Sequence, residues 1–256
     1  MAWMTLNGNR TWVKAPKSNK PVLVLLHGGL SSSAGLLHGV GRDLSRHFAI
    51  AAFDRRGHGR TPDNGDAFSY VEMANESIEF LESIKKPVDL LGYSDGGNVA
   101  LIVALKRPDL VRRMILVGAN FHFDGLVPGA IDPDDEVAKQ SFVEKYVASH
   151  PGTEAEAESL FARTIRMFQT QPTFVTHDLK NVTTPTLVVS GDDDVVALQH
   201  TVLLFESLRY SQLLVVPGAS HAVLKERPKL MAREIKRFLR GPIVPFTLMP
   251  MRRRRF

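Results

Sequence analysis

The chain has 256 residues, 44% of them hydrophobic and 23% charged, which is typical of a globular protein with a sizeable core. It contains no cysteine, so disulfides, thiolate metal sites and a cysteine nucleophile are excluded. The formal net charge is +5, but without the four arginines at residues 252–255 it falls to about +1. A nucleic-acid-binding domain would carry a basic face on its folded body, so we expect no nucleic-acid partner.

Residues 1–14 contain no basic segment followed by a long apolar run, so they indicate no secretory signal. No stretch approaches the roughly 18 uninterrupted apolar residues of a membrane-spanning helix. We therefore expect a cytoplasmic protein without a membrane span. We expect the arginine run at residues 252–255 to be a solvated end of the chain, with contact to an anionic surface as the alternative. The sequence predicts no oligomeric state.

The first elements predicted are a hairpin and a buried strand. Asn7 and Gly8 are turn residues between short β-prone runs, which indicates a hairpin over residues 3–15. The continuous apolar run at residues 21–26 suits a strand buried on both faces of a mainly parallel sheet. It leads into His27 and a glycine-rich loop that would let the backbone approach a ligand closely. We expect His27 to be a structural histidine packed under this loop.

A second apolar strand is predicted at residues 48–53, followed by a turn rich in glycine and charge at residues 54–62. We expect Asp54 and Arg56 to hydrogen-bond the backbone of this turn. We expect His58 to be exposed and not catalytic. Apolar residues at helical spacing then predict an amphipathic helix over residues 70–84.

The strongest functional signal is a serine between two glycines. An apolar, β-prone run at residues 88–93 meets Gly92, Ser94 and Gly96, and a helix-forming run at residues 98–106 follows. A serine on such a sharp strand-to-helix turn has an exposed hydroxyl, and only residues without a Cβ fit on either side of it. The pattern predicts that Ser94 is a nucleophile.

Three more strands are predicted after this turn. They lie at residues 114–118, 186–191 and 212–216. The second is followed by Asp192, Asp193 and Asp194, and the third by a loop that ends in His221. Functional groups gather at the carboxyl ends of the strands in an open parallel sheet. We therefore expect Ser94, this aspartate cluster and His221 to lie together.

Taken in order, these segments resemble the α/β-hydrolase fold family over about residues 3–241. The matching pieces are the His27-Gly28-Gly29 loop, the turn at residues 54–59 and the Gly-x-Ser-x-Gly turn at Ser94. The resemblance implies an α/β fold with a mostly parallel, twisted central sheet, flanking helices and a helical cap insertion. It also implies the catalytic order serine, acid, histidine.

The family pattern places the acid three residues after the strand-ending Gly191, which is Asp194, and the base is then His221. The resemblance also implies an oxyanion hole made by the backbone N–H of Asp95 and a second N–H from the glycine-rich loop. That second donor is Gly29 or, alternatively, Leu30.

The resemblance also divides the chain into parts. Residues 1–118 and 183–241 are expected to form one discontinuous hydrolase core, residues 119–182 a helical cap and residues 242–256 a C-terminal tail. Helices are predicted within the cap at residues 135–149 and 154–169. Candidates for contact with substrate are Leu30, Phe121, Phe168 and Asp95.

The function expected from these residues is that of a serine hydrolase of small carboxylic esters or lactones, acting through an acyl-enzyme on Ser94. The alternatives are a carbon–carbon bond in a diketone, an amide or a thioester as the scissile bond, or a ligand-binding receptor of the same fold. No metal or organic cofactor is called for, and the partner is a small-molecule substrate. Asp95 could in addition bind an ammonium group, as in resembling hydrolases that act on α-amino acid esters.

Overall fold

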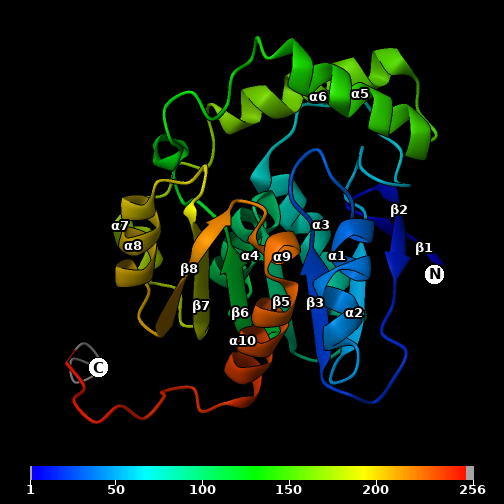
Figure 1. The fold of residues 1–256 in the computed structure, drawn as a ribbon. Helices are drawn as coiled ribbons and strands as arrows, with labels where there is room; N and C mark the ends of the chain where they lie inside the picture. Colours follow the sequence, from blue (N-terminus) through cyan, green and yellow to red (C-terminus); the bar gives the residue numbers. More distant parts are fainter. Residues whose placement is uncertain (1, 252–256) are drawn as a thin grey trace.

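The computed structural model describes residues 2–251, and residues 252–255, the predicted arginine tail, lie outside the described residues. Its centre is an eight-stranded sheet with strand order β1-β2-β4-β3-β5-β6-β7-β8 (Figure 1). The strands are β1 Ala2–Leu6, β2 Asn9–Lys14, β3 Val22–Leu26, β4 Ala49–Phe53, β5 Val88–Tyr93, β6 Val111–Val117, β7 Thr186–Asp193 and β8 Ser211–Ser220.

The strands from β3 to β8 run parallel, and only the hairpin at one edge is antiparallel. Strands β1 and β2 pair with each other and β2 pairs with β4, both antiparallel. Asn7 and Gly8 have positive φ angles at the hairpin turn, which confirms the predicted turn chemistry. The mostly parallel sheet predicted from the sequence is confirmed.

Helices cover both faces of the sheet. The α-helices of the described residues are α1 Ser33–His38, α2 Val40–Leu44, α3 Tyr70–Ser83, α4 Asp95–Lys106, α5 Glu136–Ser149, α6 Glu154–Phe168, α7 Thr176–Leu179, α8 Leu198–Ser207, α9 Val223–Glu226 and α10 Pro228–Arg240, of which α5 and α6 lie off the faces of the sheet (Figure 1). Two short 3-10 helices lie at Pro108–Leu110 and Phe123–Gly125.

Side chains alternate between the two faces along each central strand, so the core is split into two layers. In β3, Val22, Val24 and Leu26 pack on the side of α3, α4 and α8. Leu23 and Leu25 pack on the opposite side, against α1, α2 and α10. Every β3 residue is therefore buried, as expected of a strand covered on both faces.

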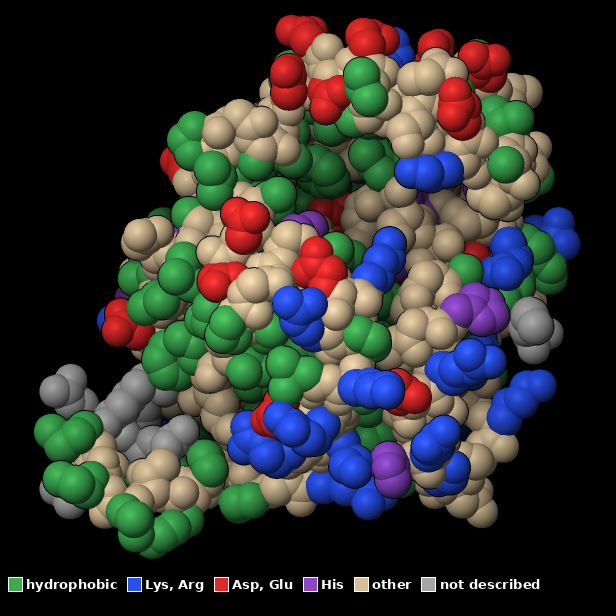
Figure 2. Space-filling model, in the orientation of Figure 1, with side chains coloured by type: hydrophobic (Ala, Val, Ile, Leu, Met, Phe, Trp, Pro, Cys, Tyr) green, Lys and Arg blue, Asp and Glu red, His purple; other side chains and the backbone are tan. Residues whose placement is uncertain are grey.

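Helices α5 and α6 form a separate layer above the carboxyl ends of the parallel strands (Figure 1). Helix α6 begins with a capping box, in which Oγ of Thr153 accepts from the N–H of Glu156 and Oε2 of Glu156 accepts from the N–H of Thr153. The two helices begin and end within one residue of the ranges predicted. Figure 2 shows a hollow between this layer and the body below it.

No helix within residues 2–251 combines the length and the apolar character needed to cross a membrane.

Candidate active site

Ser94 stands at the sharp turn between β5 and α4. Its φ of +53° lies in the left-handed region, which a residue with a side chain adopts only when its surroundings hold it there. A Cβ atom at Gly92 would lie 2.1 Å from the carbonyl oxygen of Gly96, and one at Gly96 would lie 2.1 Å from that of Leu26. The two glycines therefore let the strand, the turn and the helix approach one another and expose Ser94.

The side chains of Ser94, His221 and Asp194 form a continuous chain of hydrogen bonds. Nε2 of His221 lies 3.0 Å from Oγ of Ser94, and Nδ1 of His221 lies 2.6 Å from Oδ1 of Asp194. A carboxylate is an acceptor, so Nδ1 carries the proton and Nε2 presents its lone pair to the serine hydroxyl. The structure thus brings together the three predicted residues from three different strand ends.

Asp194 is held as a carboxylate by its surroundings. Its side chain is 1% exposed, and burial alone would raise its pKa. The hydrogen bond and charge of His221 and the N–H of Val196 outweigh burial, so the pKa of Asp194 lies below its ordinary value. Asp192 and Asp193 are exposed, and Asp192 accepts from the N–H of Ala219. Only Asp194 of the three faces His221.

The loop that carries His221 is braced on both sides. Oη of Tyr93 donates to the carbonyl oxygen of His221 at 3.1 Å. Glu226 accepts from the N–H and from Oγ of Ser220, both at 2.7 Å. Gly118 has a φ of +59°, and a Cβ there would lie 2.8 Å from the ring of His221. These contacts fix where the imidazole sits.

Backbone N–H groups next to Ser94 are free to bind a ligand. Among residues 2–251 no hydrogen bond is formed by the N–H of Gly29 or Leu30, and the N–H of Asp95 is engaged by its own carboxylate and by no other residue. A Cβ at Gly28 would lie 3.3 Å from Cβ of Ser94, so the glycine-rich loop lies against the turn. Leu30 has a φ of +48°. Unpaired N–H groups beside the nucleophile are what an oxyanion hole requires, and both Gly29 and Leu30 remain candidates for the second donor.

Asp95 lies directly after the serine and is 4% exposed. Its Oδ1 accepts from the hydroxyl of Tyr70 at 2.9 Å, while its Oδ2 has no partner among the described residues. Burial raises the pKa of Asp95 to about 6, against the opposing charge of Arg55. A carboxylate oxygen without a partner is thus placed beside the nucleophile.

Arg55 is a functional-site residue that the sequence analysis missed. It is fully buried, and its guanidinium donates to the carbonyl oxygens of His27 and Gly28 at 2.6 and 3.1 Å. The N–H of Arg55 donates to Nε2 of His27. His27 is therefore the buried structural residue expected, and Arg55 holds the glycine-rich loop in place. The only feature of the sequence that could have predicted this role of Arg55 is its position in the charged turn, next to Arg56.

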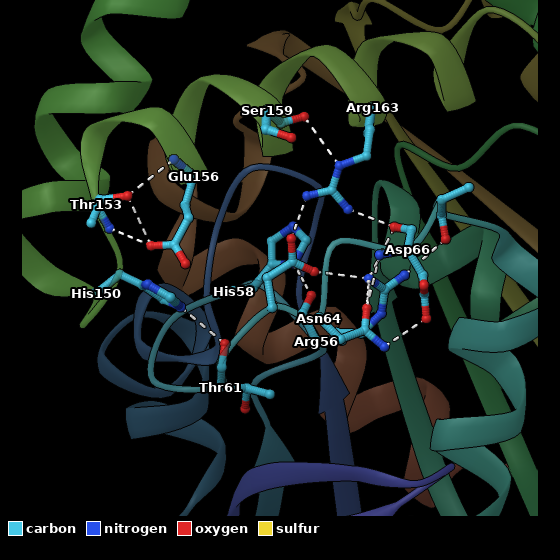
Figure 3. A network of polar contacts seen from close by, with 12 residues as sticks. Arg56, His58, Thr61, Asn64, Asp66, His150, Thr153, Glu156, Ser159 and Arg163 are labelled. Atoms are coloured by element: carbon cyan, nitrogen blue, oxygen red, sulfur yellow. Dashed lines mark hydrogen bonds and ion pairs between the residues drawn. The ribbon is translucent and has the colours of Figure 1, made fainter.

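The expectation that His58 is exposed is wrong. His58 is 2% exposed, and its ring lies 5.2 Å from that of His27. It sits below the α6 layer within a network of polar contacts (Figure 3). Nδ1 donates to the carbonyl oxygen of Arg56, and burial and the charge of Arg55 lower the pKa of His58 to about 3. His58 is buried because the overlying helices pack above it, and the sequence of the turn does not indicate this.

Asp54 has the role expected of it in this turn, whereas the backbone acceptors of Arg56 lie beyond the turn, at residues 66 and 67. Oδ2 of Asp54 accepts from the N–H of Arg60 at 3.1 Å, and its Oδ1 accepts from the N–H of Ser33 at 2.9 Å. The Arg56 guanidinium donates to the carbonyl oxygens of Asp66 and Ala67. Asp54 therefore holds this turn together, and Arg56 ties the turn to the segment that follows it.

Two cavities meet at the serine, and both are lined by Gly29, Ser94 and His221. The first has a volume of about 230 Å³ and a mostly apolar wall, to which Phe168 contributes together with Asp95. The second has a volume of about 460 Å³, and Leu30 lines it. No group of three or more His, Cys, Asp or Glu side chains that could hold a metal ion occurs in the described part of the chain.

Phe121 needs a correction, because it lines neither of these two cavities. Its ring is buried and stacks on His200 with a centroid distance of 4.0 Å. Its N–H donates to Nε2 of the same histidine at 3.1 Å. The aromatic ring that could have lined the cavity is used for packing.

Comparison with known proteins gives the same architecture. The sequence profile of the alpha/beta hydrolase family matches residues 23–234. Serine hydrolase BPHL of Homo sapiens is 31% identical over 193 residues, which cover 68% of this chain and 63% of that protein. A pimeloyl-[acyl-carrier protein] methyl ester esterase of Yersinia pseudotuberculosis is 30% identical, with coverages of 84% and 92%. The enol-lactonase of Burkholderia xenovorans LB400 superposes with a TM-score of 0.75 at 17% identity, with coverages of 94% and 100%.

Proposed function

The chain belongs to the alpha/beta hydrolase family, and from this premise we propose that it is a serine hydrolase that cleaves small carboxylic esters or lactones through an acyl-enzyme on Ser94. Hydrolase activity follows from the family and its hydrolase relatives. The observation that carries the proposal is the continuous chain of contacts from Asp194 through His221 to Ser94.

In the first half of the proposed reaction, Oγ of Ser94 attacks the carbonyl carbon while Nε2 of His221 takes the hydroxyl proton. Asp194 stabilises the imidazolium, because its carboxylate accepts from Nδ1. The N–H groups of Asp95 and Gly29, or Leu30, bind the oxyanion, each worth about 3–4 kcal/mol. The intermediate collapses, the carbon–oxygen bond of the ester breaks, and His221 gives the proton to the leaving alkoxide.

In the second half, water enters and His221 takes one of its protons as the hydroxide attacks the acyl carbon. Collapse of the second intermediate releases the carboxylic acid and returns the proton from His221 to Ser94. A lactone follows the same path, except that its alcohol stays attached to the acyl group. We further propose that residues 119–182 act as a cap that closes the cavities over Ser94, and that residues 1–118 and 183–241 form the core.

The test is hydrolysis of p-nitrophenyl acetate, butyrate and octanoate by the wild type and by Ser94→Ala, with fluorophosphonate labelling read by mass spectrometry. Ser45→Ala, which changes an exposed serine after α2, is the matched control. Turnover and labelling at Ser94, lost only in Ser94→Ala, are the expected results. Labelling without ester turnover would redirect the search to the amide, thioester or carbon–carbon alternatives, and no labelling would overturn the mechanism.

A narrower substrate class is favoured by Asp95, whose Oδ2 lacks a partner in the first cavity. A carboxylate there attracts an ammonium group, so we propose α-amino acid esters as candidate substrates. Phenylalanine ethyl ester and ethyl 3-phenylpropionate differ only in the amino group. Asp95→Asn retains the backbone N–H and should reduce kcat/KM for the amino ester selectively. Equal losses in kcat/KM on the two esters would contradict the proposal that Asp95 binds an ammonium group.

A further inference from the structure

The two cavities at Ser94 differ in charge. The first contains the carboxylate of Asp95 among mostly apolar side chains. The second contains two lysines, Lys145 from α5 and Lys225 from α9, and no aspartate or glutamate lines it. A substrate whose scissile bond lies at Ser94 has room for one half in each cavity, so each half meets a different electrostatic environment.

Neither lysine is neutralised by a neighbour. No ion pair to Lys145 or Lys225 occurs within the described residues, and Nζ of Lys145 donates only to Oγ of Ser141, at 2.8 Å. The adjacent acids are engaged elsewhere. Glu144 accepts from the amide of Gln140, and Glu226 accepts from the N–H and hydroxyl of Ser220. Both positive charges are therefore available to a ligand.

His58 and His150, which also line the second cavity, do not compete with the two lysines for a bound anion. Burial keeps His58 neutral at ordinary pH, because its pKa is lowered to about 3. His150 uses both ring nitrogens: Nε2 donates to the carbonyl oxygen of Thr61, and Nδ1 accepts from the N–H of Gly152. The two lysines belong to segments 80 residues apart in sequence, one in the upper layer and one in the core. Figure 2 shows Lys and Arg side chains both above and below the hollow.

We infer that the second cavity receives an anionic group, a carboxylate or a phosphate, carried by one half of the ester. The inference rests on the proposed function and adds a specificity to it. Two cations in a cavity that no acid lines attract an anion as it approaches and hold it once it is bound. Asp95 repels the same group from the first cavity, so the charge pattern also orients the substrate. The anion belongs to either the alcohol half or the acyl half, and the two cases are tested separately.

Two pairs of esters distinguish an anion on the alcohol half from an anion on the acyl half. In 4-acetoxybenzoate and its methyl ester, only the first carries an anion, on the alcohol half. In monophenyl succinate and phenyl methyl succinate, only the first carries an anion, on the acyl half. The enzymes are the wild type, Lys145→Met, Lys225→Met, the double variant, and Lys229→Met as a matched control. Lys229 is an exposed lysine of α10 that lines neither cavity at Ser94.

The wild type should prefer the anionic member of one pair. Each lysine variant should lose about fivefold in kcat/KM on that member, as expected for a partly exposed charge pair, with little change on its neutral partner. The loss should shrink at high salt, because added ions screen the attraction. Lys229→Met should behave as the wild type. Succinate should also slow labelling of Ser94 by a neutral fluorophosphonate, and the double variant should lose this protection.

Other outcomes distinguish failure of the anion site from failure of the proposed hydrolase function. If the neutral esters are cleaved but the lysine variants affect both members of each pair equally, the anion site is refuted and the serine hydrolase stands. The same holds if the wild type shows no preference within either pair. If Ser94 is neither labelled nor active on any ester, the proposed function fails and the anion site fails with it.

Discussion

The backbone of Gly29 lies so close to Asp95 that a Cβ atom at residue 29 would stand 2.4 Å from Oδ2 of Asp95. The same atom would lie 2.6 Å from the ring of Phe168. Contacts below 3.0 Å force the surroundings to move, so a side chain at this position displaces the glycine-rich loop or the carboxylate. The N–H groups proposed as the oxyanion hole lie on both sides of this contact.

Gly29→Ala should therefore reduce kcat by about 100-fold, the loss expected when one oxyanion donor is displaced, while the protein stays folded. Gly35→Ala is the control, because nothing lies within 4 Å of a Cβ at Gly35 in α1. Gly35 lines the second cavity, so the added methyl group can affect substrate binding, but it should not cause the 100-fold loss in kcat, and it should raise the free energy of unfolding by about 0.5–1 kcal/mol. Ester kinetics and chemical denaturation measure both effects, and full activity in Gly29→Ala would contradict the assignment of the donors.

Asp194→Asn should lower kcat by about 10⁴-fold, because an amide at this position can donate to Nδ1 of His221 and favours the wrong tautomer. Asp193→Asn is the matched control, since Asp193 is adjacent and exposed. It should keep nearly the activity of the wild type. The measurement is the initial rate on p-nitrophenyl butyrate with both proteins checked for folding by circular dichroism. A large loss of activity in Asp193→Asn would contradict the assignment of Asp194 as the acid of the triad.

The α5–α6 layer is tied to the core by a polar network (Figure 3). Arg163 of α6 pairs with Asp63 and donates to the carbonyl oxygen of Asp66 at 2.5 Å. Both charged side chains are mostly buried, so their coupling in a double-mutant cycle should reach about 1–2 kcal/mol. Arg163→Gln and Asp63→Asn complete the cycle in chemical denaturation.

Arg163→Gln should also speed proteolysis within residues 119–182, because the layer loses one of its ties to the core. Arg166→Gln on the same helix removes an exposed arginine and should do neither. Additive effects of the two Arg163 and Asp63 variants would show that the pair does not couple the layer to the core.

Glu76 should contribute stability at low pH that is lost as the pH rises from about 4.5 to about 7. This side chain is 3% exposed, and burial raises its pKa to about 7 against the opposing charge of Arg55. The unfolded chain ionises Glu76 near its ordinary pKa, whereas the folded chain keeps the proton until about pH 7. Folding therefore takes up a proton in this interval, and the contribution of Glu76 to the free energy of unfolding declines as the pH rises.

Glu76→Gln should remove this contribution, so the change in the free energy of unfolding between low and high pH should differ from that of the wild type by about 3 kcal/mol. Guanidinium unfolding of both proteins at pH 4.5 and pH 8 measures it. Glu79→Gln, three residues later and exposed, should retain the wild-type pH dependence. An unchanged pH dependence in Glu76→Gln would mean that other groups carry the linkage.

Local patterns in the sequence were sufficient to predict the strands along the chain and the longer helices at residues 70–84, 98–106, 135–149 and 154–169. A strand buried on both faces reads as a continuous apolar run, and Gly92 and Gly96 mark a turn that no other residue could form. Helix caps and the turn at Asn7 and Gly8 depend on contacts between residues that are close in sequence. The fold class and the hydrolase family were predicted correctly for this reason, since they depend on signals that neighbouring residues carry.

For other side chains, only the tertiary structure decided whether they are buried and which residues they contact. His58 is neutral and buried because His27 and the overlying layer cover it, and nothing in its own turn reveals this. Phe121 stacks on a histidine 79 residues away, so it lines neither cavity at Ser94. Lys145 and Lys225 face one cavity only because α5 lies above the strand ends. Burial, pKa and the charge of a cavity depend on contacts between distant segments, and these form only when the chain is packed.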